Sequence, residues 1–153
     1  MKLSRAIGIA GLTGLLLFAG CNDSNSDEIA LRVAALSYAF EHDTETAANQ
    51  SAWIFTIESD LYQEDVVQAL TEYPLAKGTV KIEDRDSMRR IDLNSGKPFA
   101  HWTVKKVNWK AASEVWVEVG CVKGGLNGYG QVLVLKKKSG RWSAVSSIPT
   151  WVS

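Results

Sequence analysis

Apolar residues recur at helical spacing in one early stretch of the chain and again in a shorter one. The first stretch carries Ile29, Val33, Leu36 and Phe40. This spacing places all four on one face and predicts a helix over residues 26–41. The shorter pattern predicts a second helix over residues 64–73, which Pro74 ends because proline cannot continue the backbone hydrogen bonding.

Strand periodicity dominates the rest of the chain. Between Val115 and Cys121 every second residue is apolar, while Trp116 and Glu118 occupy the other face, as in a half-buried strand. Turn-forming glycine, asparagine and proline residues separate such segments. Strands are predicted over residues 52–57, 79–83, 100–109, 114–122, 131–135 and 141–147.

One of these strands changes face partway along its length. Its apolar residues are Trp102 and Val104 on one face and Val107 and Trp109 on the other. One extra residue between the two pairs would bring all four to the same side of the sheet. The pattern therefore predicts a β-bulge near Lys105 and Lys106.

Together these elements predict an α+β domain. The N-terminal helix and the short second helix are expected to pack on a curved antiparallel sheet whose strands follow one another as a meander. A cone-shaped sheet of the cystatin or nuclear-transport-factor type would fit the same element order. That analogy concerns the fold alone and supplies no function.

The first twenty residues have the layout of a secretory signal peptide. Lys2 and Arg5 precede an apolar run over residues 6–18, and two small residues follow the run. The run is shorter than the ~20 apolar residues that a permanent transmembrane helix needs. Residues 1–20 are therefore expected to be removed.

The segment Phe18-Ala19-Gly20-Cys21 resembles the lipobox of bacterial lipoproteins, which ends in a small residue followed by the lipidated cysteine. The resemblance implies that Cys21 carries a fatty acyl chain, such as palmitate, on its amine and a diacylglyceryl group on its sulfur, three chains in all. Several acyl chains hold a protein at a membrane almost permanently. Asn22 implies, by the same resemblance, the outer membrane facing the periplasm if the source is Gram-negative. The alternative is an ordinary signal peptide that leaves Cys21 as a free thiol.

The mature chain is expected to hold a short tether over residues 21–26 and a single domain over residues 27–153. A composition of 46% hydrophobic and 22% charged residues is that of a globular domain. Six tryptophans, all after residue 50, can supply large buried areas. Only Cys121 would remain unmodified, so no internal disulfide is expected.

The net charge of zero hides a strong division along the chain. Residues 22–72 carry eleven acidic side chains and one basic one, whereas residues 73–153 carry fourteen basic and six acidic ones. The absence of an overall basic field argues against nucleic acid as a partner. The favoured interpretation is that the two charges cancel within the fold. The alternative is that the basic half meets an anionic lipid surface or an acidic envelope protein.

A glycine-rich segment over residues 123–130 contains four glycines. A phosphate-binding loop needs a helix N-terminus after it, and a strand is predicted here, so nucleotide binding is not expected. The favoured interpretation is a hairpin loop whose glycines allow positive φ angles. The alternative is a ligand loop built on Asn127 and Tyr129. Trp116, opposite the valine row, is expected to meet a helix or to form an exposed binding patch.

Neither a catalytic group nor a metal site is assigned. Cys121 with His101 could be a thiol nucleophile and its base, but Cys121 belongs to the inward row of its strand and is predicted to be a core residue. His42 lies among acidic residues at the end of the first helix, where one histidine and solvated carboxylates do not converge as metal ligands must. No cofactor is expected.

Residues from Trp53 onward also resemble small uncharacterised secreted bacterial proteins. The shared features are the strand Trp53-Ile54-Phe55-Thr56-Ile57, the pair Val107 and Trp109, the glycine-rich segment, Gly140-Arg141-Trp142 and the ending Trp151-Val152-Ser153. This resemblance implies no activity.

The sequence therefore predicts a lipid-anchored cell-envelope protein that acts as a noncatalytic binding or interaction module. The alternative is a small cone-fold enzyme or hydrophobic-ligand carrier with a pocket between the first helix and the sheet. A deep apolar pocket with an acidic residue or histidine at its floor would favour the alternative. A filled core and a flat face of tryptophan and lysine would favour the binding module.

Overall fold

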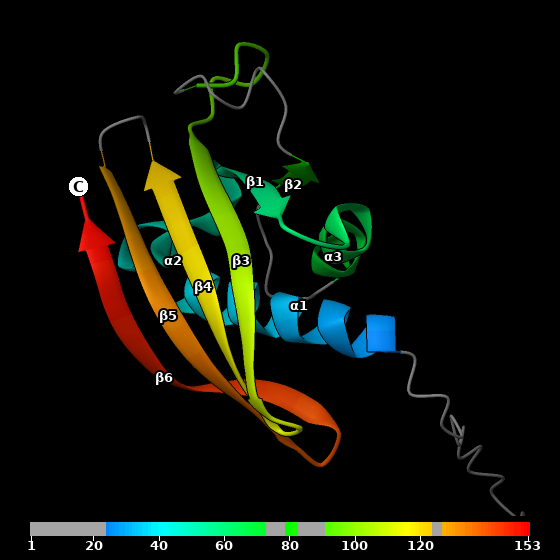
Figure 1. The fold of residues 1–153 in the computed structure, drawn as a ribbon. Coiled ribbons are helices and arrows are strands. Elements are labelled where there is room, and N and C mark those ends of the chain that lie inside the picture. Colours follow the sequence, from blue (N-terminus) through cyan, green and yellow to red (C-terminus); the bar gives the residue numbers. More distant parts are fainter. Residues whose placement is uncertain (1–23, 73–78, 83–90, 124–126) are drawn as a thin grey trace, which may run out of the picture.

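A computed structural model describes residues 24–72, 79–82, 91–123 and 127–153 (Figure 1). The predicted signal peptide, Cys21 and Asn22 lie outside them. Among the described residues, no helix combines the length and the apolar character that crossing a membrane requires.

The described elements are four helical segments and six strands. The helical segments are α1 (Ser24–His42), α2 (Thr44–Ala48), the 3-10 turn η1 (Gln50–Ala52) and α3 (Gln63–Thr71). The strands are β1 (Ile54–Ser59), β2 (Thr79–Ile82), β3 (Phe99–Ala111), β4 (Glu114–Lys123), β5 (Asn127–Lys138) and β6 (Arg141–Val152).

The two predicted helices are present, and α1 begins earlier than its apolar spacing indicated. Residues 24–26, expected in the tether, are already helical. The short helix α2 was not predicted. It forms because Asp43 caps it, with the backbone N–H of Thr46 donating to Asp43 Oδ1 over 2.8 Å.

The six strands form one sheet in the order β2-β1-β3-β4-β5-β6. The strands β3 to β6 pair antiparallel as the predicted meander. The expectation of a wholly antiparallel sheet is wrong, because β1 pairs parallel with both β2 and β3. The helix α3 lies between β1 and β2 and carries the chain back, so that β2 runs in the same direction as β1. The α+β class is confirmed, with a mixed sheet.

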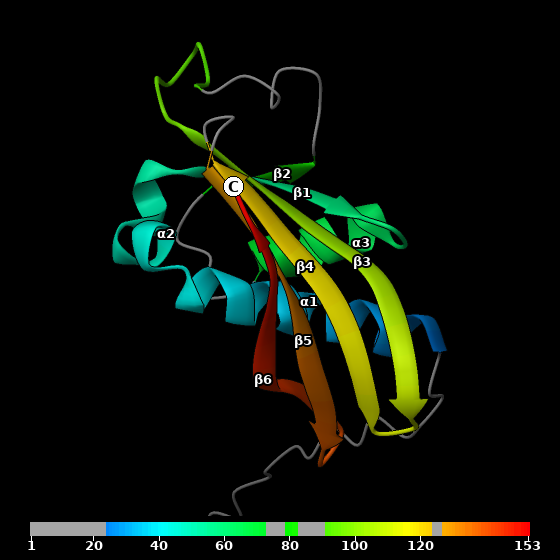
Figure 2. The ribbon, with the colours of Figure 1, turned by 60° about the vertical axis from the view of Figure 1, so that its left-hand side comes forward.

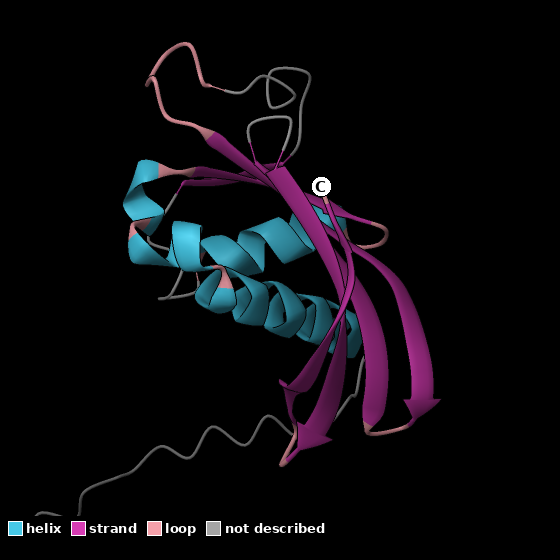
Figure 3. Ribbon diagram, turned by 90° about the vertical axis from the view of Figure 1, so that its left-hand side faces the viewer, coloured by secondary structure: helices cyan, strands magenta, loops and turns pink. Residues whose placement is uncertain are grey.

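The sheet curves around α1 and α3, which cover the same face (Figures 2 and 3). Between these layers lies a hydrophobic core to which both helices and β1, β3, β4, β5 and β6 contribute. Its largest fully buried side chain is Trp102, whose ring meets Phe40 of α1 edge to face at 4.9 Å between centroids. The core is filled by side chains from segments far apart in the sequence, so the described residues form one domain.

The predicted bulge in β3 is confirmed. The pairing of β3 with β4 shifts register between Lys105 and Asn108. Lys106 takes a left-handed φ of 53°, a conformation that a bulge can impose on a residue other than glycine. As expected, the bulge brings Val107 to the same side of the sheet as Trp102. Val107 packs against the core in which Trp102 is fully buried.

A charged residue lies within the buried face of α1. Arg32 is 1% exposed. Its guanidinium donates two hydrogen bonds to Asp60 Oδ1, at 3.0 Å from Nε and 2.9 Å from Nη2, and also pairs with Glu28. These partners satisfy the charge that burial would otherwise penalise, and they tie α1 to the loop after β1.

Candidate binding face

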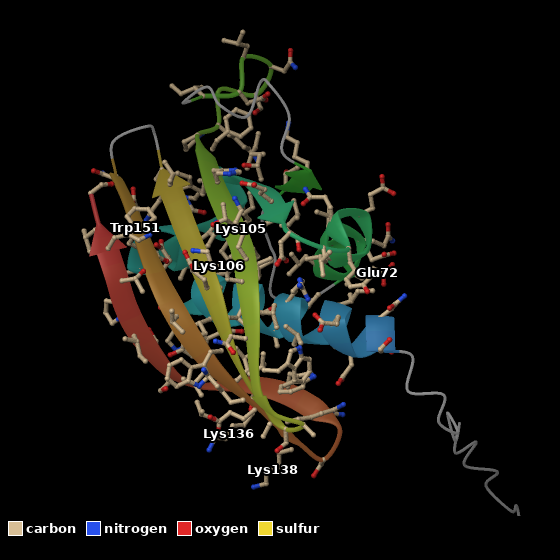
Figure 4. All side chains as sticks on the ribbon, in the orientation of Figure 1. Glu72, Lys105, Lys106, Lys136, Lys138 and Trp151 are labelled. Carbon is tan, nitrogen blue, oxygen red and sulfur yellow. The ribbon has the colours of Figure 1, made fainter. Side chains whose placement is uncertain are left out.

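The sheet has one face covered by α1 and α3 and one face, here called the outer face, on which no described helix lies (Figures 1 and 3). Alternation along β4 separates the two. Val115, Val117 and Val119 are fully buried toward the helices, whereas Trp116 and Glu118 point to the outer face. Figure 4 looks onto the outer face and labels Trp151, Lys105 and Lys106 on it.

Trp151 lies flat across three glycines of the outer face. A β-carbon on Gly130 would stand 2.0 Å from Trp151 Nε1, and one on Gly128 would stand 3.0 Å from Trp151 Cζ3. On Gly120, in β4, it would stand 3.6 Å from Trp151 Cζ2. Only residues without a side chain allow the indole to approach the strands so closely. The ring is nevertheless 42% exposed, so its other side faces solvent.

This contact corrects the interpretation of the glycine-rich segment. Gly128 and Gly130 lie within β5 rather than in a hairpin loop, and neither has a positive φ. Their role is close packing under Trp151. Gly124 and Gly125 lie outside the described residues.

Exposed apolar side chains surround Trp151 on the outer face. Val122 is 39% exposed and Ile148 is 45% exposed, and Val132, the partner of Ile148 across β5 and β6, is half-buried. Further along β4, the ring of Trp116 lies under Lys110 Nζ, which is 4.8 Å from the ring centroid. No described helix covers Trp116, and its side chain is half-buried beneath Lys110 rather than exposed as a patch.

Ion pairs between neighbouring strands border this apolar region. Lys105 Nζ lies 2.6 Å from Glu58 Oε1, and Lys106 Nζ lies 2.9 Å from Glu118 Oε2. The hydrogen bond from Lys105 lowers the pKa of the Glu58 carboxyl against the opposing effect of burial. The outer face thus combines flat aromatic and apolar surface with a charged margin.

A hydroxyl, an imidazole and a carboxylate meet where β1 lies beside β3. Thr56 Oγ1 is 2.9 Å from His101 Nδ1, and His101 Nε2 is 3.6 Å from Glu58 Oε2. The order resembles that of a catalytic triad, but Thr56 is fully buried and its hydroxyl cannot reach a substrate. The three groups therefore hold β1 against β3.

Cys121 and His101 lie on opposite faces of the sheet. Cys121 is fully buried against the helices, in line with Val119, and burial raises the pKa of its thiol. His101 pairs in register with Val122, the outward-facing neighbour of Cys121. The two cannot form a nucleophile and base, and the prediction that Cys121 is a core residue is confirmed.

A polar cluster joins the α1–α2 junction to the inner side of β4. Lys123 Nζ contacts Asp43 Oδ2 at 2.9 Å and Glu45 Oε2 at 2.9 Å. Burial raises the pKa of Asp43, but hydrogen bonds from Lys123 and Thr46 lower it by more. The net pKa of the carboxyl therefore lies below its ordinary value. The same pairing raises the pKa of Lys123 against the effect of its burial.

The polar cluster also borders an open hollow of about 330 Å³. Its lining residues are His42, Asp43, Thr44, Lys123, Tyr129 and Gln131. Burial and the Asp43 carboxylate raise the pKa of the Tyr129 phenol, which therefore stays protonated. His42 stacks on Tyr38 at 3.9 Å and its Nδ1 lies 2.8 Å from Tyr38 O. Because Asp43 and Lys123 satisfy each other, the cluster acts as a link between helix and sheet.

The structure does not bring the three predicted ligand residues together. Tyr129 lies on the inner face, where its ring meets Trp102, and Asn127 is exposed at the start of β5. Trp116 is on the outer face, paired with Val134 near the other end of the sheet. Sequence reasoning did not single out Trp151, because the tryptophans were expected to supply large buried areas. Trp109 and Trp151 are instead about two-fifths exposed.

The charge division of the chain is partly absorbed by the fold. Acidic residues of the helical region pair with lysines of the sheet, as in Asp43 with Lys123 and Asp27 with Lys137. These contacts support the interpretation that the two halves of the chain neutralise each other. Within the described residues, no group of three or more histidine, cysteine or acidic side chains could hold a metal ion.

Comparison with known proteins gives no match to a family model, to a curated protein or to a solved structure.

Proposed function

We propose that this chain is a lipid-anchored cell-envelope protein and a noncatalytic binding module whose contact surface is the outer face. The anchor is Cys21, from the resemblance of residues 18–21 to a lipobox. For a Gram-negative source the location is the outer membrane, on its periplasmic side.

The single observation that carries the binding role is the arrangement of Trp151 over glycines. A tryptophan that only filled a core would be buried, whereas Trp151 presents one side of its ring to solvent while the other is held flat on the sheet. A rigid, half-exposed aromatic ring has little conformational entropy to lose when a partner covers it. The adjacent Val122 and Ile148 extend the surface.

Site-specific photo-cross-linking in growing cells tests this role. A benzophenone side chain at Val122 is expected to cross-link to an envelope component, and Trp151→Ala is expected to abolish that product. The matched control position is Leu93, which is 76% exposed and lies in the turn before β3. Equal products from both positions, or an unchanged product with Trp151→Ala, would contradict the proposal.

A second function is favoured by one hollow between α1 and the sheet. An open cleft of about 440 Å³ is lined by Ala30, Val33, Ala34, Gly140, Arg141 and Trp142. Its volume falls within the ~300–1,000 Å³ of small-molecule sites. A cleft of this size would allow the protein to act as a carrier of small hydrophobic ligands. Filling it with Ala34→Trp would abolish binding of an apolar fluorescent probe if the cleft takes such ligands.

A further inference from the structure

The start of α1 lies close to the proposed lipid anchor. Only three residue steps separate Cys21 from Ser24, the first residue of α1. A fully extended chain spans at most ~3.6 Å per residue, so this segment reaches only about 11 Å. If Cys21 is acylated, as the proposed function holds, the first turn of α1 is held next to the bilayer.

Two β-hairpins end beside this part of α1. Asp27 accepts hydrogen bonds from Trp142 Nε1 at 2.9 Å and from Lys137 Nζ at 2.6 Å. Glu28 accepts one from Trp109 Nε1 at 3.0 Å. These bonds fix the β3–β4 and β5–β6 hairpins against the helix, and Figure 1 shows both of their turns at the lower end of the molecule.

The ends of these hairpins carry exposed cations. Lys138 and Arg141 pair across the β5–β6 turn in the strand register, and both are exposed. Neither forms an ion pair with a carboxylate that the structure describes. Lys110 is exposed on the β3–β4 hairpin, and Lys136 is 56% exposed while contacting Glu114.

An exposed aromatic residue lies next to Lys110 in the chain, on the helix-facing side of the β3–β4 hairpin. Trp109 is 41% exposed, and its Nε1 already has an acceptor in Glu28. Tryptophan in this state suits the boundary between lipid headgroups and water, where an apolar ring and a satisfied polar end are both accommodated. We call Trp109, Lys110, Lys136, Lys138 and Arg141 the hairpin-tip surface.

We propose that the hairpin-tip surface docks on the anionic headgroups of the membrane that holds Cys21. The short tether keeps this surface at a high local concentration of headgroups, so that a few weak charge contacts suffice. The acidic helix α3 lies away from the hairpin tips. Figure 4 shows Glu72, the residue that follows α3, well separated from Lys136 and Lys138. This orientation directs the far end of the sheet, with the 91–98 segment, away from the bilayer.

The test uses the acylated protein in vesicles of phosphatidylcholine containing phosphatidylglycerol. A fluorophore is attached at Ser139→Cys, in the β5–β6 turn, or at the control Asn94→Cys, an exposed turn at the far end. Cys121 is buried and an acylated Cys21 has no free thiol, so only the introduced cysteine reacts. Lipids with a nitroxide headgroup are expected to quench the probe at position 139 and leave the probe at position 94 bright.

Charge variants test the chemistry of docking. The triple variant Lys110→Gln, Lys138→Gln and Arg141→Gln is expected to lower the ratio of docked to undocked protein by about 100-fold. Each cation near an anionic surface raises that ratio about fivefold, and three are removed. Lys81→Gln with Lys97→Gln removes two charges away from the hairpin tips and should leave quenching unchanged, whereas Lys138→Gln with Arg141→Gln, which removes two charges at the tip, should lower it. Pure phosphatidylcholine should reproduce the loss.

Equal quenching at positions 139 and 94, or quenching that survives removal of the three hairpin-tip charges, would overturn this orientation. Acylation of Cys21 is measured separately, by mass spectrometry of the N-terminal peptide. An unacylated Cys21 would overturn the proposed anchoring, whereas an acylated Cys21 without quenching at position 139 would overturn only the docking surface.

Discussion

The indole nitrogen of Trp151 occupies the space in which a β-carbon on Gly130 would stand, with 2.0 Å between the two positions. The two residues are register partners across β5 and β6. Trp151 can lie flat on the outer face only while Gly130 has no side chain. The proposed binding surface therefore depends on the absence of a side chain at position 130.

Gly130→Ala is expected to displace the Trp151 ring and to lower the free energy of unfolding by about 1–3 kcal/mol, as overpacking does. Urea unfolding followed by tryptophan fluorescence measures the change. Gly120→Ala probes a different contact, because its β-carbon would lie 3.6 Å from the Trp151 ring but 2.9 Å from Thr103 Oγ1. In a Trp151→Ala background the cost of Gly130→Ala should largely vanish, and an unchanged cost would show that the ring is not the cause.

The buried Arg32 makes the loss of Asp60 costly. Asp60→Asn is expected to lower the free energy of unfolding by about 2–4 kcal/mol, because it removes the charged acceptor of two hydrogen bonds while leaving the guanidinium buried. Arg32→Met should cost less, since an apolar side chain of similar length can fill the site. Chemical denaturation of both variants checks the order, and an equal or larger cost for Arg32→Met would contradict it.

The link between Asp43 and Lys123 predicts a dependence of stability on pH. The folded-state pKa of Asp43 lies below its ordinary value of 3.8, so its ionised form stabilises the fold above that pH. This contribution should be lost as the pH falls below 3.8 and through the folded-state pKa. The difference in unfolding free energy between the natural chain and Asp43→Asn is expected to shrink over that range, as measured by urea unfolding. In a Lys123→Met background most of this dependence should disappear.

Cys121 should react with iodoacetamide only when the chain unfolds. Its thiol is fully buried and burial raises its pKa, so the reactive thiolate is neither formed nor accessible in the native state. Mass spectrometry of the acylated protein is expected to show no added group before denaturation and a single one afterwards. Rapid labelling of Cys121 in the native protein would contradict its assignment to the core.

Much of the local structure could be predicted from the order of residues. The spacing of Ile29, Val33 and Leu36 located α1, and the change of face in β3 located the bulge that the register shift near Lys105 confirms. Both follow from periods that a helix or a strand imposes on its own residues. The burial of Cys121 followed from the same alternation in β4.

The candidate site was harder to predict, since its parts are distant in the sequence. Trp151 and Gly120 lie thirty-one positions apart and meet only because β5 brings β4 and β6 to its two sides. Nothing in the segment around Trp151 distinguishes a core tryptophan from one that packs on glycines. Asn127, Tyr129 and Trp116 were chosen for their chemistry, and the alternation of strands distributes Tyr129 and Trp116 to opposite faces.

By itself, the sequence determined the two main helices and the central part of each strand, which side of β4 is buried, and the motif at Cys21 from which the anchor is proposed. These properties depend on neighbours within a few residues along the chain. The tertiary structure alone decided that β1 runs parallel to its neighbours, that Arg32 is buried with Asp60, and that Trp151 covers three glycines. Strand pairing and the burial of a charge depend on contacts between distant segments, and a periodic pattern carries no information about which segments those will be.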